Sequence, residues 1–201
     1  MNKTLKPRTK LRGLCRVMSG LIVLMCGLSL SGVAVGNQAK LESPNRVKAA
    51  FLRNFAHYVK WPAAAFESAV SPWRIGVVGD DALGEVLESA LSGRSEHGRR
   101  FEIHSVDSLG KLPPCHIVVV ALEDSRKRRA ALLELKNKPV LTVADDADTL
   151  REGGIIRFEL SDRIRMSVNL DQARAASLSI PTEMLEVSSE VLEHGVLRRM
   201  R

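Results

Sequence analysis

The stretch "CHIVVVA", Cys115 to Ala121, is apolar almost throughout and contains no turn residue. A continuous apolar run of this length is typical of a strand that is buried on both faces of a parallel sheet. The stretch "PVLTVA", Pro139 to Ala144, has the same character, and a basic amphipathic segment over residues 125–136 separates the two. A buried strand, a helix and a second buried strand in this order predict a parallel sheet.

The alternation of strands and helices continues towards the N-terminus. Polar loops separate the segments, and capping residues precede the helices. The order predicts an α/β fold that is Rossmann-like in outline, with a mainly parallel sheet and helices on both faces. The predicted segments are a helix over 44–60 that begins at Ser43-Pro44, a strand over 73–79, a helix over 82–91 after Asp80 and Asp81, and a strand over 100–106.

Beyond Gly153-Gly154 two alternating segments, "IIRFEL" over 155–160 and "IRMSVNL" over 164–170, predict an antiparallel hairpin. A three-residue loop places Leu160 opposite Ile164 and Glu159 opposite Arg165, so that the apolar faces of the two strands agree. The face turned to solvent is then polar. It comprises Arg157, Glu159, Arg165, Ser167 and Asn169.

After the hairpin, Asn169 or Asp171 is expected to cap a helix that runs to Leu178. Pro181 is expected to begin another helix, which runs to about Glu193. We expect residues 37–192 to form a single domain and residues 193–201 to be a disordered basic tail.

The first 36 residues have the layout of a secretory signal peptide. Six basic residues precede an uncharged segment from Val17 to Gly36, and cleavage is expected near Ala34-Val35-Gly36. An uncleaved membrane anchor is the alternative, because twenty uncharged residues are long enough to span a bilayer. In either case the rest of the chain is exported.

The net charge of +7 comes almost entirely from this leader. Six of the 30 Lys and Arg residues lie in it, which leaves 24 basic residues against 23 acidic ones. A nearly neutral exported domain gives no indication of nucleic-acid binding. Cys15 and Cys26 also lie in the leader, so Cys115 is left without a partner for an internal disulfide, and its apolar surroundings predict a buried thiol.

Sequence motifs for catalysis are missing. "GDDALGEV", which begins at Gly79, has the glycine spacing of a P-loop but carries Glu85 where the phosphate-binding lysine belongs. The five histidines show no metal-ligand spacing, and the chain has no G-x-S-x-G. We therefore expect neither an enzyme nor a cofactor.

Four aspartates follow predicted parallel strands, namely Asp80, Asp81, Asp145 and Asp146. Parallel strands bring these residues to the same edge of the sheet, where α/β proteins bind ligands. With Gly79 they form a candidate ligand site, either a metal pocket or the pocket of a phospho-receiver, although a receiver would need a further aspartate where Ala121 and Leu122 stand. Helix capping explains each aspartate separately and is the favoured interpretation.

Four of the eight aromatic residues lie in "KAAFLRNFAHYVKWP", Lys48 to Pro62. Phe51 and Phe55 share a helical face with Val47 and are assigned to the core. Tyr58 and Trp61 sit at the end of the helix with a polar group each, which suits a partner-facing patch together with Asn54 and His57. Alternatively, Trp61 only fastens the helix end to the sheet.

Five stretches of the chain, in this order and with similar gaps, resemble the YfiR family of periplasmic proteins. The resemblance covers about residues 47–191, and its most specific parts are the helix with the "WP" ending and the hairpin with the helix after it. The stretches are "VKAAFLRNFAHYVKWP", "WRIGVVGDD", "CHIVVVAL", "PVLTVADD" and "GGIIRFELSDRIRMSVNLDQARAASLSI".

The resemblance implies a periplasmic repressor that binds the periplasmic sensor domain of an inner-membrane diguanylate cyclase, or of another membrane sensor, and lowers cyclic-di-GMP and biofilm formation. The two partner surfaces that we expect are the patch at the end of the helix and the polar face of the hairpin. The alternative function is a periplasmic small-ligand binder that uses the carboxyl edge of the sheet, and a homodimer is a further assembly that we consider. Such repressors are associated with paired cysteines, which Cys115 cannot supply.

Overall fold

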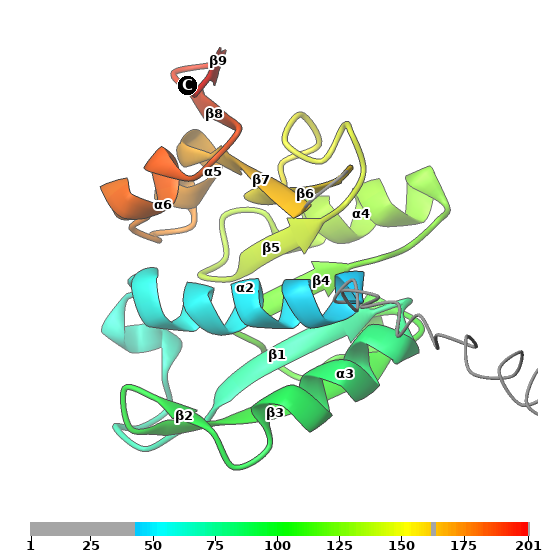
Figure 1. The fold of residues 1–201 in the computed structure, drawn as a ribbon, viewed down its shortest axis with the longest axis vertical. Helices are drawn as coiled ribbons and strands as arrows, with labels where there is room; N and C mark the ends of the chain where they lie inside the picture. The colour runs from blue at the N-terminus through cyan, green and yellow to red at the C-terminus, as the bar shows by residue number, and fades with distance from the viewer. Residues whose placement is uncertain (1–42, 162–163, 201) are drawn as a thin grey trace, which may run out of the picture. The chain divides into compact units, whose positions relative to one another are not determined.

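The computed structural model describes residues 43–161 and 164–200, and the predicted signal peptide lies outside them. Helices and strands alternate along the chain as expected (Figure 1). The first half contains α2 (Pro44–Tyr58), η1 (Ala63–Ala65), β1 (Trp73–Val78), α3 (Asp81–Leu91), β2 (Ser95–Glu96), β3 (Arg99–Val106), η2 (Leu109–Lys111) and β4 (Ile117–Val120). The second half contains α4 (Ser125–Leu135), β5 (Leu141–Ala144), β6 (Ile156–Leu160), β7 (Ile164–Asn169), α5 (Leu170–Ala175), α6 (Thr182–Glu186), β8 (Glu190–Glu193) and β9 (Val196–Arg199).

The described strands form one nine-stranded sheet in the order β2-β3-β1-β4-β5-β6-β7-β8-β9. Its centre is parallel, because the five adjacent strands β3, β1, β4, β5 and β6 all run in the same direction. The apolar run that begins at Cys115 supplies β4, whose four residues are all buried. The predicted α/β class with a mainly parallel, Rossmann-like sheet is therefore confirmed.

Helices cover both faces of the sheet. Alternate residues of β1 show how the faces divide, since Ile75 and Val77 join one buried cluster and Val78 joins another. The larger cluster lies under α2, α3, α5 and α6, and Figure 1 shows α2 and α3 side by side across this face. The smaller cluster lies under α4 through Ala131, Leu132 and Leu135.

Helix α2 contributes the aromatic centre of the larger cluster. Phe55 is only 1% exposed, and Phe51 packs against the cluster from its margin, as their shared helical face predicted. The helix ends at Tyr58, two residues before the expected end. The reason is that Lys60 exchanges two backbone hydrogen bonds of 3.0 Å with Ser179 and is held in an extended conformation.

The predicted register of the β6–β7 hairpin is confirmed. Leu160 pairs with Ile164 and Glu159 pairs with Arg165, while residues 162 and 163 of the loop lie outside the described residues. The expectation that the whole polar face is open to solvent is wrong for Ser167 and Asn169, which are buried. Both residues belong to the part of β7 with which β8 pairs in parallel. Ser167 contacts Ser189 before β8 at 3.0 Å, and Asn169 bonds to Leu150 and Gln172.

The C-terminal end differs from the prediction. The helix after Pro181 ends at Glu186, and residues 190–199 form the antiparallel hairpin β8–β9 instead of a helix end and a disordered tail. The turn residues His194 and Gly195 both have positive φ, as a two-residue type I′ turn requires. Asp171 fixes this turn, because its carboxylate accepts hydrogen bonds of 2.8 Å from both turn N–H groups.

Candidate functional site

The end of α2 presents an exposed patch of ring side chains. Tyr58 is 45% exposed and the His57 side chain is 47% exposed. The two rings meet edge to face at 4.6 Å, and the His57 ring stacks on His97 at 5.3 Å. We call His57, Tyr58 and His97 the ring patch; Asn54 is exposed on the preceding turn of the helix.

Short polar contacts hold the ring patch on a rigid base. The Glu96 carboxylate accepts hydrogen bonds from His57 Nδ1 at 2.8 Å and from Arg53 Nη2 at 3.1 Å. Burial would raise the pKa of Glu96, but these two hydrogen bonds outweigh burial and lower the pKa below its ordinary value. His97 Nε2 donates to the His57 carbonyl oxygen at 2.9 Å, so β2 and the turn after it are tied to the helix end.

Trp61 belongs less to the ring patch than to the core beneath it. Its ring is half-buried and meets the buried Trp73 ring edge to face at 4.9 Å. Trp73 Nε1 in turn donates to the Glu96 carbonyl oxygen at 3.0 Å, directly behind the carboxylate that holds His57. This geometry agrees with the alternative in which Trp61 fastens the helix end to the sheet.

Sequence reasoning missed the contribution of Glu96 and His97 to this surface. Both residues lie in "SGRSEHG", which reads as a polar loop but forms β2 and its turn into β3. The sequence signal for this hairpin is the pair His97-Gly98 between residues able to pair as strands. A two-residue type I′ turn needs positive φ at both positions, and both residues have it in the structure.

The polar face of the hairpin is a closed network rather than a set of separate side chains. The Arg157 guanidinium donates to Glu159, to Ser167 Oγ at 3.3 Å and to Glu190 Oε2 at 3.0 Å. Burial would raise the pKa of Glu159, but hydrogen bonds from Ser167, Arg157 and Ser189 outweigh it and lower that pKa. Glu190 and Ser189 were not predicted members, because they come from β8 and the residue before it.

Asn169 does not belong to an exposed partner surface. Its side chain is buried, its Oδ1 accepts from Gln172 N at 2.9 Å, and its Nδ2 donates to the Leu150 carbonyl oxygen at 2.9 Å. Asn169 is therefore the N-cap of α5, and of the two predicted candidates, Asn169 and Asp171, it is the one that caps the helix. Arg165 of the same strand is exposed and lies opposite Glu159.

The structure brings the aspartates of the carboxyl edge together around an open hollow of about 760 Å³, which Gly79, Asp80, Asp145 and Asp146 line. Asp80 caps α3 through Leu83 N at 2.9 Å, and Asp81 is exposed at the first position of that helix. Asp145 lies 2.5 Å from the buried Lys48 Nζ. Asp146 lies 3.0 Å from Arg128 Nη2, and it, rather than Asp145, accepts from the N–H of Asp148.

These cation and backbone contacts account for Asp80, Asp145 and Asp146. Within the described residues, no group of three His, Cys, Asp or Glu side chains is arranged to hold a metal ion. The hollow remains a concave surface at the sheet edge where α/β proteins bind ligands.

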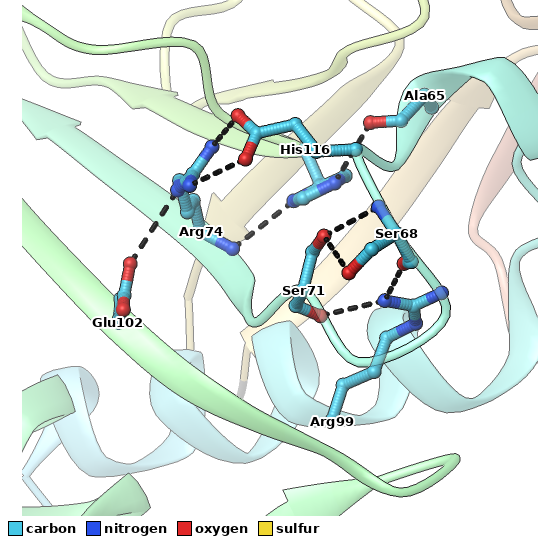
Figure 2. Close-up of polar contacts among 8 residues, drawn as sticks. Ala65, Ser68, Ser71, Arg74, Arg99, Glu102 and His116 are labelled. Carbon is cyan, nitrogen blue, oxygen red and sulfur yellow. Dashed lines mark hydrogen bonds and ion pairs between the residues drawn. The ribbon is translucent and has the colours of Figure 1, made fainter.

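A buried histidine organises the opposite end of the sheet (Figure 2). His116 Nδ1 accepts from Arg74 N at 3.0 Å, and His116 Nε2 donates to the Ala65 carbonyl oxygen at 3.1 Å. Its ring stacks on the Phe66 ring at 4.5 Å. The Arg99 guanidinium in turn lies 3.9 Å from the centre of the Phe66 ring. Arg99 also donates to the Ser68 and Ser71 carbonyl oxygens, and Arg74 Nη1 donates to Glu67 at 2.7 Å, so the loop after η1 is held from β3 and from β1.

The stability of the protein should fall as the pH drops below neutrality because of His116. Burial lowers the pKa of His116, with Arg74 and Arg99 adding to this effect, so the unfolded chain takes up the proton at a higher pH than the folded chain. Protonation therefore favours unfolding as the pH falls through the ordinary histidine range towards the depressed folded-state pKa. The stability that neutral His116 contributes is fully present above that range. Urea unfolding at several pH values should show that the free energy of unfolding falls less steeply with decreasing pH in His116→Gln than in wild type.

The control for this experiment is His194→Asn at an exposed turn position, because asparagine tolerates the positive φ of His194. This variant should keep the wild-type change of unfolding free energy with pH. An identical pH dependence of His116→Gln and wild type between pH 7.5 and 5 would contradict the role assigned to His116.

Cys115 is buried, as predicted, and lines a pocket of about 510 Å³ together with apolar residues such as Leu112 and Leu135 and charged ones such as Arg74 and Glu134. Burial raises the pKa of the Cys115 thiol to about 11. Since the thiolate is the reactive form, we expect the folded, exported chain to react slowly with a thiol reagent at pH 8 and the unfolded chain to take up one equivalent at once. A covalent dimer on a non-reducing gel would revive a redox role for Cys115.

None of the helices within residues 43–161 and 164–200 has the length and apolar character that a membrane span requires. A comparison with curated proteins finds no match. A family model described as YfiR/HmsC-like matches residues 45–189, which include the ring patch, the hairpin and the carboxyl edge. The match confirms the resemblance seen in the five stretches of sequence, so the chain belongs to the YfiR/HmsC-like family of periplasmic regulators of cyclic-di-GMP signalling.

Proposed function

We propose that this protein is a non-enzymatic periplasmic repressor. It binds the periplasmic sensor domain of an inner-membrane diguanylate cyclase and holds the cyclase inactive, which lowers cyclic-di-GMP and biofilm formation. Family membership and the predicted signal peptide support the compartment and the signalling system.

The observation that carries this proposal is the ring patch. Tyr58 is half exposed although it stands on a helix whose opposite face is buried, and the contacts of His57 and His97 restrict how its surroundings can move. Exposed aromatic residues on rigid supports are frequent hot spots of protein interfaces, because little conformational entropy is lost when they are covered. The patch needs no chemical reaction to act, which suits a regulator that works by contact.

Deletion of the gene should raise the cellular level of cyclic-di-GMP and increase biofilm, because the cyclase loses its repressor. Restoring the wild-type gene should reverse both effects, and restoring Tyr58→Ala should not, provided that equal amounts of the two proteins reach the periplasm. An unchanged level of cyclic-di-GMP in the deletion strain would contradict repression of a cyclase.

A periplasmic small-ligand binder is the second candidate, and the hollow of about 760 Å³ at the carboxyl edge favours it. A ligand there would meet Gly79 and the aspartates, together with the buried Arg128. Thermal-shift screening of the purified protein with metabolites separates the two functions. A large rise of the melting temperature with a metabolite alone, lost in an Asp146→Leu variant, would favour the binder.

A further inference from the structure

Strand β9 is the outermost strand of the sheet and has a neighbour on one side only among the described strands. Figure 1 shows it at the C-terminal end of the chain, beyond β8. The type I′ turn at His194-Gly195 and its two hydrogen bonds to Asp171 hold the strand in an extended conformation. A fixed, extended edge is a template to which a further strand can be added.

The direction of the backbone groups of β9 follows from its register. Met200 N donates to the Ser189 carbonyl oxygen at 2.9 Å, which turns the backbone groups of Met200 towards β8. Inward and outward positions alternate along an antiparallel strand, so Arg198 and Val196 also point inwards, while Leu197 and Arg199 point outwards. The N–H and C=O groups of Leu197 and Arg199 are therefore directed to the open side of the strand.

The side chains of this edge are unusually apolar for a free surface. Val196 is 52% exposed, Leu197 is 46% exposed and Met200 is 39% exposed. With Val187 they make up half of the large hydrophobic side chains that are exposed in the described part of the chain. A groove of about 590 Å³ lies beside the strand, and its lining is mixed: Val187 and Met200 are among its apolar members, and Glu186, Glu190 and Arg199 are among its charged ones.

Charge selects the kind of segment that this edge fits. The sequence "HGVLRRMR", which begins at His194, contains three arginines and no acidic residue. The Arg199 side chain is 88% exposed, although its Nε lies 3.6 Å from Glu190. On the groove side Arg199 is balanced by Glu190, whereas Arg198 lies on the opposite face of the sheet, so a covering segment gains most if its apolar side chains face the groove and its acidic ones face Arg198.

We propose that β9 is the docking edge for an extended, acidic segment of the partner protein, which adds a strand to the sheet beside β9 and places an apolar side chain in the groove. The backbone groups of Leu197 and Arg199 would bond this strand, and Arg198 would favour its carboxylates on the face opposite the groove. This inference deepens the proposed function by naming a second contact surface, and it rests on that function only for the identity of the partner.

A second copy of the chain fits this edge poorly. Two β9 strands in antiparallel register would set arginines against arginines or against apolar side chains, and β9 offers no carboxylate in return. A membrane surface fits poorly as well. Val196 and Leu197 are adjacent residues of a strand, so their side chains point to opposite faces of the sheet and cannot enter a bilayer together.

The test uses amide hydrogen exchange of the full exported chain, followed by NMR. In the free protein the amides of Leu197 and Arg199 should exchange quickly and those of Val196 and Arg198 slowly. A seven-residue peptide of alternating valine and glutamate should slow the exchange of Leu197 and Arg199, and its valine–lysine counterpart should not. Equal effects of the two peptides, or no effect of either, would overturn the proposal, and so would protection of these amides by anionic vesicles alone.

A proline variant connects the edge to the partner. Leu197→Pro removes only an outward N–H and should leave the melting temperature close to that of wild type, whereas Arg198→Pro removes an N–H that pairs with β8. Leu197→Pro should weaken binding of the cyclase's periplasmic domain by about tenfold, and Leu197→Ala should weaken it less, because it keeps the N–H.

The outcomes distinguish this inference from the proposed function. If wild type and Leu197→Pro bind the cyclase domain equally well, the edge is not the docking site while the proposed function stands. If the acidic peptide protects the edge but the cyclase domain does not bind, the proposed function fails and the edge remains a docking site for another acidic partner.

Discussion

Replacing Phe55 by alanine is expected to lower the free energy of unfolding by about 3–5 kcal/mol, the range for a large buried aromatic side chain. Phe55 is 1% exposed and lies where α2 meets the sheet. Its ring stacks on Phe158 of β6 at 6.0 Å and lies 6.1 Å from Phe51. The truncation would leave a cavity between helix and sheet, which urea unfolding followed by circular dichroism would detect.

Phe55→Leu is the matched variant, because it fills most of the space and should lose far less stability than alanine. Tyr58→Ala, three residues further along the same helix, is the surface control and should unfold close to wild type. A Phe55→Ala protein as stable as Tyr58→Ala would show that α2 is not the helix that closes the core.

Replacing Tyr58 by alanine is expected to weaken binding of the cyclase's periplasmic domain by about 2 kcal/mol or more, which corresponds to a roughly 30-fold rise in Kd. The side chain is exposed and meets the ring of His57, which Glu96 holds in place. Its loss removes exposed contact area from the ring patch without opening the core.

Tyr58→Phe separates the ring from its hydroxyl group and should keep most of the affinity if burial of the ring dominates. Trp61→Ala should lose stability, because Trp61 packs on Trp73 and the core. Unchanged affinity of Tyr58→Ala would remove the ring patch from the interface and leave the polar hairpin face and β9 as the surfaces to test.

The central sheet could be predicted because its signals are local. The runs that begin at Cys115 and Pro139 are apolar except for His116 and Thr142, and this pattern is typical of a strand buried on both faces. The register of the β6–β7 hairpin was also predictable, because a shift by one residue would turn Phe158 and Met166 away from the core.

The C-terminal hairpin was not predicted, because its segments are short and their pattern is ambiguous. "EVLE" over 190–193 suits a helix end as well as a strand, and its pairing with β7 is set by tertiary contacts. The turn His194-Gly195 was the one local signal for the hairpin.

The members of the candidate surfaces could be predicted only in part. His57 and Tyr58 follow from the helical period of α2, which places them beyond the buried face. Glu96 and His97 approach them from a hairpin about forty residues away in sequence, and Glu190 joins Arg157 from β8. Such contacts depend on the order of the strands in the sheet, which no local pattern of the sequence encodes.

Repression of a cyclase by contact can be tested by calorimetric titration of the purified exported chain with the periplasmic domains of the inner-membrane diguanylate cyclases that the same cell carries. We expect saturable binding to one of them, loss of affinity in Tyr58→Ala, and less cyclic-di-GMP made by that full-length cyclase in membranes when the chain is added. No binding to any of these domains, with cyclase output unchanged by the chain, would contradict repression by contact.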